Sequence, residues 1–270
     1  MEQANAIRKW LTAPHRTSSS VPLSVLHSDP LISYSGVTPH APLGAASLIG
    51  PRLWRKPAWF LLSPTWTIEN FRMARNIRRA AVRHRMTHPL HKFIILCNTD
   101  AETEVMRGLG EAATTHNKTT NTSETVFRPL EGVEVEFDAI YNAQLASWKR
   151  HELAVDIPTC AFLFYRGVSS TAKSEAALIS RHMRSAPAHV FLNEFDDAGK
   201  PIRFEPELVN FHLNRAAVGL CLSAEEGAMF ASAEYQLAGL PVVTTPNRGG
   251  RDLYVDRDFC LKIRDDPREI

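Results

Sequence analysis

The 270-residue chain lacks a long apolar segment, a strong excess of charge and any set of paired cysteines. Because no apolar run reaches transmembrane length and the N-terminus has no signal-peptide core, we expect a soluble, cytoplasmic protein. A formal net charge of +2 argues against nucleic acid as a partner of the whole chain. The four cysteines lie singly in or beside apolar runs, which favours buried thiols in a reducing compartment over disulfides.

Metal-binding patterns are missing as well. Eleven histidines are present, but none forms a His-x₃-His pair with a third ligand at a useful spacing. His84 and His88 are four residues apart, yet they lie among arginines that would repel a dication. We therefore expect no metal and no cofactor beyond a bound substrate.

The order of apolar runs and breakers predicts an α/β protein with parallel sheets and right-handed crossovers. Residues 1–55 are rich in Pro, Ser and His and are predicted to be irregular. Residues 56–130 contain about two β-α units and end in a polar linker, whereas residues 131–270 alternate cleanly between strands and helices. The expected strands are 58–62, 92–97, 138–141, 160–165, 189–192, 218–222, 241–244 and 259–263, and the expected helices are 67–88, 101–110, 149–155, 171–183, 206–216 and 227–238.

Residues 222–245 carry the most informative pattern, which is a strand end, an acidic turn, a helix stopped by glycine and a Pro-Val-Val strand. We expect the helix to begin after Ser223, so that free N–H groups at Gly227 and Ala228 face a diphosphate. Glu226 would then hold sugar hydroxyls, and Glu234, two turns further on, would hold ribose hydroxyls. Ser223 and Glu226 are also spaced as a capping box, which needs no ligand.

A second basic segment follows the first strand of residues 131–270. Lys149 and Arg150 are expected in the first turn of a helix, where cations oppose the helix dipole. Either a nucleotide diphosphate or a neighbouring acid such as Glu152 would relieve that repulsion, and the spacing leaves both open. Further along, Gly249 and Gly250 predict a turn. The arginines beside it, Arg248 and Arg251, are predicted at the surface, with a phosphate contact as the alternative.

The string Glu226-x₇-Glu234, followed by Gly-x-Pro-Val-Val, resembles the donor-sugar site of retaining, family 4-like (group 1) glycosyltransferases of the GT-B fold. The resemblance covers residues 92–270 and is strongest over 138–258. It implies two Rossmann-like domains, the N-terminal one short and the C-terminal one truncated. It also implies hexosyltransferase activity that moves a sugar, with retention and without metal, from a nucleotide diphosphate sugar to a saccharide or lipid-linked saccharide acceptor in polysaccharide biosynthesis. Glu226 and Lys149 would be the catalytic residues.

Three departures from the family pattern stand out. When Gly-Arg-Leu-x-x-x-Lys-Gly is aligned on Leu145, Lys149 matches the lysine, but Gln144 replaces the arginine that holds the diphosphate. Arg150 is a candidate substitute. Met229 replaces the second glycine of Glu-Gly-x-Gly, and the acceptor-side glycine-rich loop is not found. The alternatives are therefore a degenerate or truncated nucleotide-sugar-binding protein, or a GT-B-type epimerase.

The helix expected at 67–88 carries six arginines between Arg72 and Arg85. A solvated outer helix is the favoured interpretation, and peripheral contact with the anionic inner face of a membrane is the alternative. Aromatic residues are not interleaved with the arginines, which argues against binding of single-stranded nucleic acid.

Overall fold

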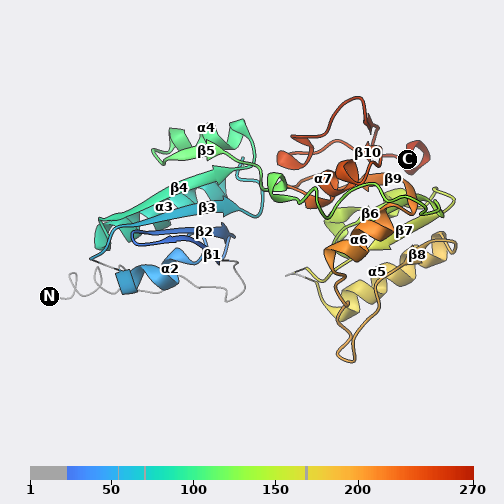
Figure 1. Cartoon of the computed structure of the whole chain (residues 1–270), viewed down its shortest axis with the longest axis horizontal. Helices are drawn as coiled ribbons and strands as arrows, with labels where there is room; N and C mark the ends of the chain where they lie inside the picture. The colour runs from blue at the N-terminus through green and yellow to red at the C-terminus, as the bar shows by residue number, and fades with distance from the viewer. Residues whose placement is uncertain (1–22, 54, 70, 168–169) are drawn as a thin grey trace. The chain divides into compact units, whose positions relative to one another are not determined.

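The structure is a computed structural model that describes residues 23–53, 55–69, 71–167 and 170–270. The chain divides into two compact units, Met1–Lys118 and Thr119–Ile270 (Figure 1). Each unit has a largely parallel sheet with helices packed on it, so the predicted α/β class with two sheet domains is confirmed. Of the segment predicted to be irregular, residues 1–22 lie outside the described residues.

The first unit contains a five-stranded sheet in the order β1-β2-β3-β4-β5, in which β1 is antiparallel and the other strands are parallel. The prediction of an irregular segment up to residue 55 is wrong for the described part, because β2 pairs with β3 along its whole length. Serines hide this strand from pattern analysis: Ser33 and Ser35 face the interior, and the Ser35 hydroxyl accepts a hydrogen bond from the Ala45 amide. The elements are β1 (Leu23–Ser28), β2 (Leu31–Val37), α2 (Ala46–Ile49), η1 (Gly50–Leu53), β3 (Ala58–Pro64), α3 (Phe71–Thr87), β4 (His91–Cys97), α4 (Asp100–Gly108) and β5 (Ala113–Thr115), and the short turn η2 (Lys118–Asn121) spans the division between the units.

Helix α3 is the arginine-rich helix, and its inner face packs Ile77 and alanines into the core. Two of its arginines, Arg78 and Arg85, bind the buried carboxylate of Glu111 at 3.0 and 2.7 Å. These two therefore serve the fold. Arg72, Arg75 and Arg79 are exposed, and membrane contact through them stays a prediction. No helix in the described ranges is both long and apolar enough to cross a membrane.

The second unit contains a six-stranded parallel sheet in the order β11-β10-β9-β6-β7-β8. The chain runs outward from β6 to β8, returns to place β9 beside β6, and runs outward again to β11. This is the doubly wound order, in which ligands bind at the carboxyl ends of the two strands where the order reverses, here β6 and β9. The elements are β6 (Phe137–Asn142), β7 (Cys160–Leu163), α5 (Ala172–Ser185), β8 (Val190–Phe191), α6 (Pro206–Leu213), β9 (Ala216–Cys221), α7 (Phe230–Leu237), β10 (Val242–Thr244) and β11 (Cys260–Lys262).

All the predicted strands of the second unit are present, but one predicted helix is not. Residues 149–155 form two 3₁₀ turns, η3 (Ser147–Lys149) and η4 (His151–Ala154), instead of an α-helix. Arg150 lies between them with a left-handed backbone, at φ 54°. This conformation interrupts the helix, so that η3 ends and η4 begins as a separate turn. Two more short 3₁₀ turns, η5 (Gly250–Asp252) and η6 (Pro267–Glu269), follow later in the chain.

The predicted linker and domain boundary are shifted relative to the structure. The division falls after Lys118 rather than after residue 130. Phe127 packs in the core of the second unit, and the amides of Arg128 and Leu130 donate to the side-chain oxygens of Asn210 and Asn214 at 3.1 and 2.8 Å. These bonds satisfy backbone donors that a free linker would leave to water, so the end of the predicted linker belongs to the second unit.

Both units contain a buried pair of histidines of the same design. In the second unit, Nε2 of His182 on α5 lies 2.8 Å from Nδ1 of His189, and Nε2 of His189 lies 2.7 Å from the carbonyl oxygen of Ile157. A carbonyl can only accept, so His189 carries its proton on Nε2 and accepts from His182 through Nδ1. His84 and His91 form the same pair in the first unit. Each pair therefore links a helix to the start of the neighbouring strand through one buried hydrogen bond.

Acid should weaken the second unit through its buried histidines. Burial, and then the neighbouring histidine, lower the pKa of His182 to about 4 and that of His151 to about 3. Histidine in the unfolded chain titrates at about 6.5. Below that pH the unfolded chain binds protons that the folded state does not, which favours unfolding. We expect the free energy of unfolding to fall by about 1 kcal/mol per pH unit for each such histidine between pH 6 and 4.

Urea unfolding followed by circular dichroism at several pH values measures this slope. In the variant His151→Phe, the slope of the free energy of unfolding against pH should be smaller by the contribution of one histidine. An unchanged slope in that variant would show that His151 is not the group responsible.

Candidate functional site

The residues predicted to bind a donor substrate gather at the carboxyl ends of β6 and β9. The segment after β6 supplies Gln144, Lys149 and Arg150, and the segment after β9 supplies Ser223 and Glu226. Glu234 comes from α7, which packs on β9. The doubly wound order alone explains this meeting, since it places β6 and β9 side by side.

Lys149 and Glu226 form a buried ion pair, with Nζ of the lysine bound to Oε1 of the glutamate. Each residue is only 6% exposed. The Ser223 hydroxyl donates to the same oxygen at 3.3 Å, and the buried Tyr141 hydroxyl donates to the Lys149 carbonyl at 2.7 Å. Because both charges have left water, removing either one would leave the other buried and uncompensated.

The loop between β9 and α7 differs from its prediction. Helix α7 begins at Phe230 with Met229 as N-cap, so Ser223 does not start a helix and does not form a capping box. The amides of Gly227 and Ala228 are therefore not those of a helix N-terminus. The loop is held instead by the segment after β10: the Glu226 amide donates to the carbonyl of Arg248 at 3.1 Å.

The predicted glycine turn after β10 is present. Gly249 has φ 105°, a left-handed conformation that favours glycine, and the Gly250 amide donates to the Gly227 carbonyl at 2.9 Å. The turn thus ties the loop after β9 to the end of β10. Arg248 is exposed and pairs with the carboxylate of Glu225.

Arg251 is the largest departure at the site, because it is 1% exposed and not a surface arginine. Its guanidinium donates to the carbonyls of Ser223 and Thr245 and to the Thr244 hydroxyl, and it pairs with Asp252 at 2.6 Å. One planar group thereby fastens the loop after β9 to the end of β10. Its position after two glycines carries no sign of burial in the sequence.

Arg150 also serves the architecture. Its Nε donates to the Leu222 carbonyl, and its two terminal nitrogens bind Thr245 at 2.7 Å and Asp265 at 2.9 Å. The left-handed backbone of Arg150 turns the side chain toward the end of β9. The Arg150 guanidinium therefore holds these segments in position. Its N–H donors already have partners within the protein and are not available to a phosphate.

Glu234 lies half-buried beside the end of β6. Asn142, the last residue of β6, donates to Glu234 Oε2 at 3.0 Å. Burial raises the pKa of Glu234 to about 7, against the opposing effects of that hydrogen bond and of Arg203. The sequence prediction missed Asn142, although its place at the carboxyl end of a core strand is the signal that would have found it.

Gln144 closes against the loop after β7. It hydrogen-bonds Tyr165, and a Cβ added at Gly167 would lie 2.6 Å from its amide oxygen, so the Gln144 side chain lies close against the Gly167 backbone. Gln144 is therefore packed between neighbours. Within the described ranges, no cluster of three or more His, Cys, Asp or Glu is arranged to hold a metal ion.

Comparison with known proteins shows likeness in structure only. No family model matches the sequence, and no curated protein does. Among solved structures, similar chains include sucrose-phosphate synthase from Thermosynechococcus elongatus (12% identity, TM-score 0.63, 90% of this chain) and Anabaena HepE in complex with UDP-glucose (14%, 0.57, 83%). A third is the UDP-forming α,α-trehalose-phosphate synthase from Burkholderia vietnamiensis (13%, 0.51, 87%).

The chain spans 63% of the length of each of these three proteins. At 12–14% identity the likeness establishes the fold and no more. The fold is the GT-B type that the sequence pattern predicts, with an α/β unit on each side of the division after Lys118.

Removal of the Arg251 side chain should destabilise the second unit strongly. In Arg251→Ala, the carbonyls of Ser223 and Thr245 lose their buried donors and Asp252 loses its partner, so we expect a loss of about 3–5 kcal/mol in the free energy of unfolding. The matched variant Arg248→Ala breaks only an exposed pair and should change it by less than about 1 kcal/mol. Urea unfolding of both variants measures the difference. Similar losses in the two would contradict a structural role for Arg251.

Proposed function

We propose that this chain binds a nucleotide diphosphate sugar at the carboxyl ends of β6 and β9 and transfers the sugar, with retention, as a group 1-type glycosyltransferase. The observation that carries the proposal is the meeting of Lys149, Glu226 and Glu234 at the point where the strand order reverses. Two of the similar structures support the ligand class, since one holds UDP-glucose and another is named as UDP-forming.

The buried ion pair suggests how the donor is received. A diphosphate brings negative charge to Lys149, which can then leave Glu226 for the phosphate oxygens. Glu226, released, becomes an acceptor for sugar hydroxyls. As the bond from the anomeric carbon to the diphosphate breaks, charge develops on the leaving oxygen, and the ammonium of Lys149 stabilises it without a metal. The acceptor hydroxyl oxygen then bonds to the anomeric carbon on the face that the diphosphate leaves, and its proton passes to the departing diphosphate oxygen.

Glu234 and Asn142 supply the proposed ribose contact. The ionised Glu234 carboxylate can accept hydrogen bonds from the two ribose hydroxyls, while the Asn142 amide donates to Glu234 Oε2 and keeps the carboxylate in position. This arrangement positions the nucleoside and leaves the diphosphate near Lys149, which is the alignment that transfer requires.

A second candidate function is binding of a nucleotide sugar without turnover. The observation that favours it is the loss of free guanidinium groups: Gln144 stands in place of an arginine, and the donors of Arg150 and Arg251 are already occupied. Lys149 would then hold the diphosphate without a guanidinium from Arg150 or Arg251. Detection of a glycosidic product by mass spectrometry, with UDP-glucose and a set of saccharide acceptors, separates transfer from binding.

Nucleoside diphosphates should stabilise the protein against heat, since a ligand that binds only the folded state raises the melting temperature. Thermal-shift measurements with UDP, GDP and ADP identify the base. Absence of stabilisation by all three would contradict the proposed function.

The phosphate assignment is tested by removing both charges of the pair together. The double variant Lys149→Met/Glu226→Gln leaves no uncompensated buried charge, so it should fold. Its affinity for UDP should fall at least about tenfold, the value of one charge-assisted contact, while its affinity for uridine changes little. Isothermal titration calorimetry measures both. Lys173→Met, on the exposed face of α5, is the control, and equal losses for UDP and uridine would rule out a phosphate contact.

UDP binding should strengthen as pH rises through the pKa of Glu234, about 7. Below that pH the carboxyl group is protonated, and above it the ionised oxygens accept more strongly from ribose hydroxyls. Calorimetry at pH 6, 7 and 8 on the native protein and on Glu234→Gln isolates this effect, because the diphosphate titrates equally in both. Parallel pH profiles for the two proteins would exclude Glu234 from the ribose contact.

A further inference from the structure

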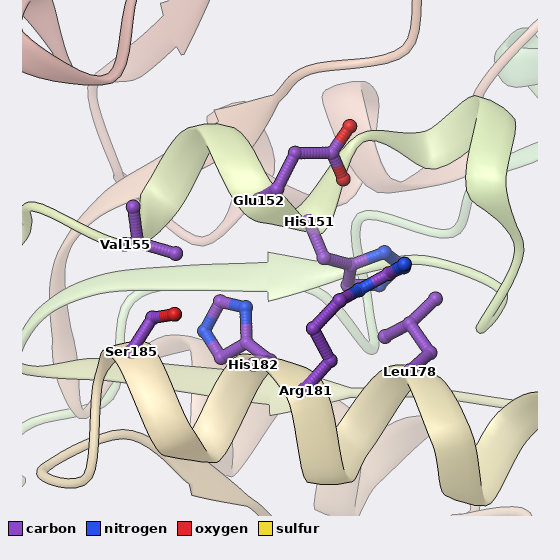
Figure 2. A pocket seen from close by; sticks show the side chains of 7 residues that line it. All are labelled: His151, Glu152, Val155, Leu178, Arg181, His182 and Ser185. Carbon is purple, nitrogen blue, oxygen red and sulfur yellow. The ribbon is translucent and has the colours of Figure 1, made fainter.

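A pocket of about 210 Å³ lies between η4 and α5 in the second unit (Figure 2). None of its lining residues belongs to the proposed donor site. One wall comes from η4 and the residue after it, and the other comes from the last turns of α5. The side chains used below are His151 and Val155 on the first wall, and Leu178, Arg181 and Ser185 on the second.

His151 is the unusual member of this pocket. It is 1% exposed, and neither of its ring nitrogens has a hydrogen-bond partner. The ring packs on Tyr141 and Phe162 at centroid distances of 5.1 and 5.7 Å. Burial keeps its pKa near 3, so the imidazole is neutral and holds one donor and one acceptor. A buried polar group left without partners is destabilising, and a ligand that supplies one would bind favourably.

Arg181 provides the charge. Its side chain rises from α5 toward His151, whereas the Glu152 carboxylate is turned away from α5 (Figure 2). Across the described parts of the chain, Arg181 has neither an ion pair nor a hydrogen bond to another group. A cation therefore faces a neutral imidazole with no acceptor between them. The Ser185 hydroxyl adds a further donor on the same wall.

Apart from His182, the rest of the lining is apolar. Val155 and Leu178 lie on opposite walls, and both offer methyl groups to the pocket. Inorganic anions gain nothing from such walls, whereas a short hydrocarbon body buries its surface against them. The forked guanidinium of Arg181 matches the two oxygens of a carboxylate.

We propose that this pocket binds a small organic carboxylate with a short branched or linear apolar body. Its carboxylate lies between Arg181 and His151, accepting from the guanidinium and from the imidazole N–H, and its hydrocarbon part extends along the apolar walls of the pocket. The site stands whether or not the carboxyl ends of β6 and β9 bind a nucleotide.

The probe is 3-methylbutanoate, with 3-methylbutanamide as an uncharged molecule of the same shape and inorganic phosphate as an anion without a carbon body. Calorimetry on the full chain should show saturable binding of 3-methylbutanoate at one site, with the amide and phosphate at least about tenfold weaker. Arg181→Gln and His151→Phe should each weaken binding at least about tenfold. Arg184→Gln, an exposed arginine of the same helix outside the pocket, should not change it.

Absence of saturable binding by 3-methylbutanoate would overturn the proposal. Equal affinity for phosphate would overturn the carboxylate class, because the apolar walls would then contribute nothing. Unchanged binding in Arg181→Gln would remove the pocket as the site. Arg181→Gln changes an exposed side chain and should leave the fold intact, so its binding result tests the proposed carboxylate site even if His151→Phe fails to fold.

Discussion

The buried ion pair between Lys149 and Glu226 joins the two halves of the second unit's sheet. One partner follows β6 and the other follows β9, the two strands at which the chain reverses its direction of winding. Neither charge is tolerable alone in that position, so the pair requires both segments to be held accurately. Arg251 and Arg150 provide this by fastening the loop after β9 and the end of β10 to the same edge of the sheet.

This use of arginine explains why the site looks poor in cations although the sequence around it is rich in them. Arg150 and Arg251 donate hydrogen bonds to backbone carbonyls and threonine hydroxyls, and Arg248 pairs with Glu225 at the surface. In the proposed function Lys149 is the cation that changes partner, because an ammonium on a flexible stem moves more readily than a fixed guanidinium. An exchangeable lysine that is already paired favours modest diphosphate affinity, because the charge of Lys149 is compensated by Glu226 until a ligand enters.

Much of the second unit can be predicted from its sequence, because each core strand is an apolar run bounded by breakers, as at Cys160–Leu163. The meeting of Lys149 with Glu226 also follows from strand order together with the family resemblance. The rest depends on tertiary contacts that leave no local pattern. Buried serines conceal β2, a left-handed Arg150 splits an expected helix into two turns, and Arg251 is buried by partners distant in the chain.

A crystal structure of the protein with UDP tests the central claim most directly. The account predicts the diphosphate at the carboxyl ends of β6 and β9, with the Lys149 ammonium within hydrogen-bonding distance of a phosphate oxygen and its ion pair with Glu226 broken. The ribose hydroxyls should lie on the Glu234 carboxylate. A nucleotide bound elsewhere, or bound here with the Lys149–Glu226 pair intact, would contradict it.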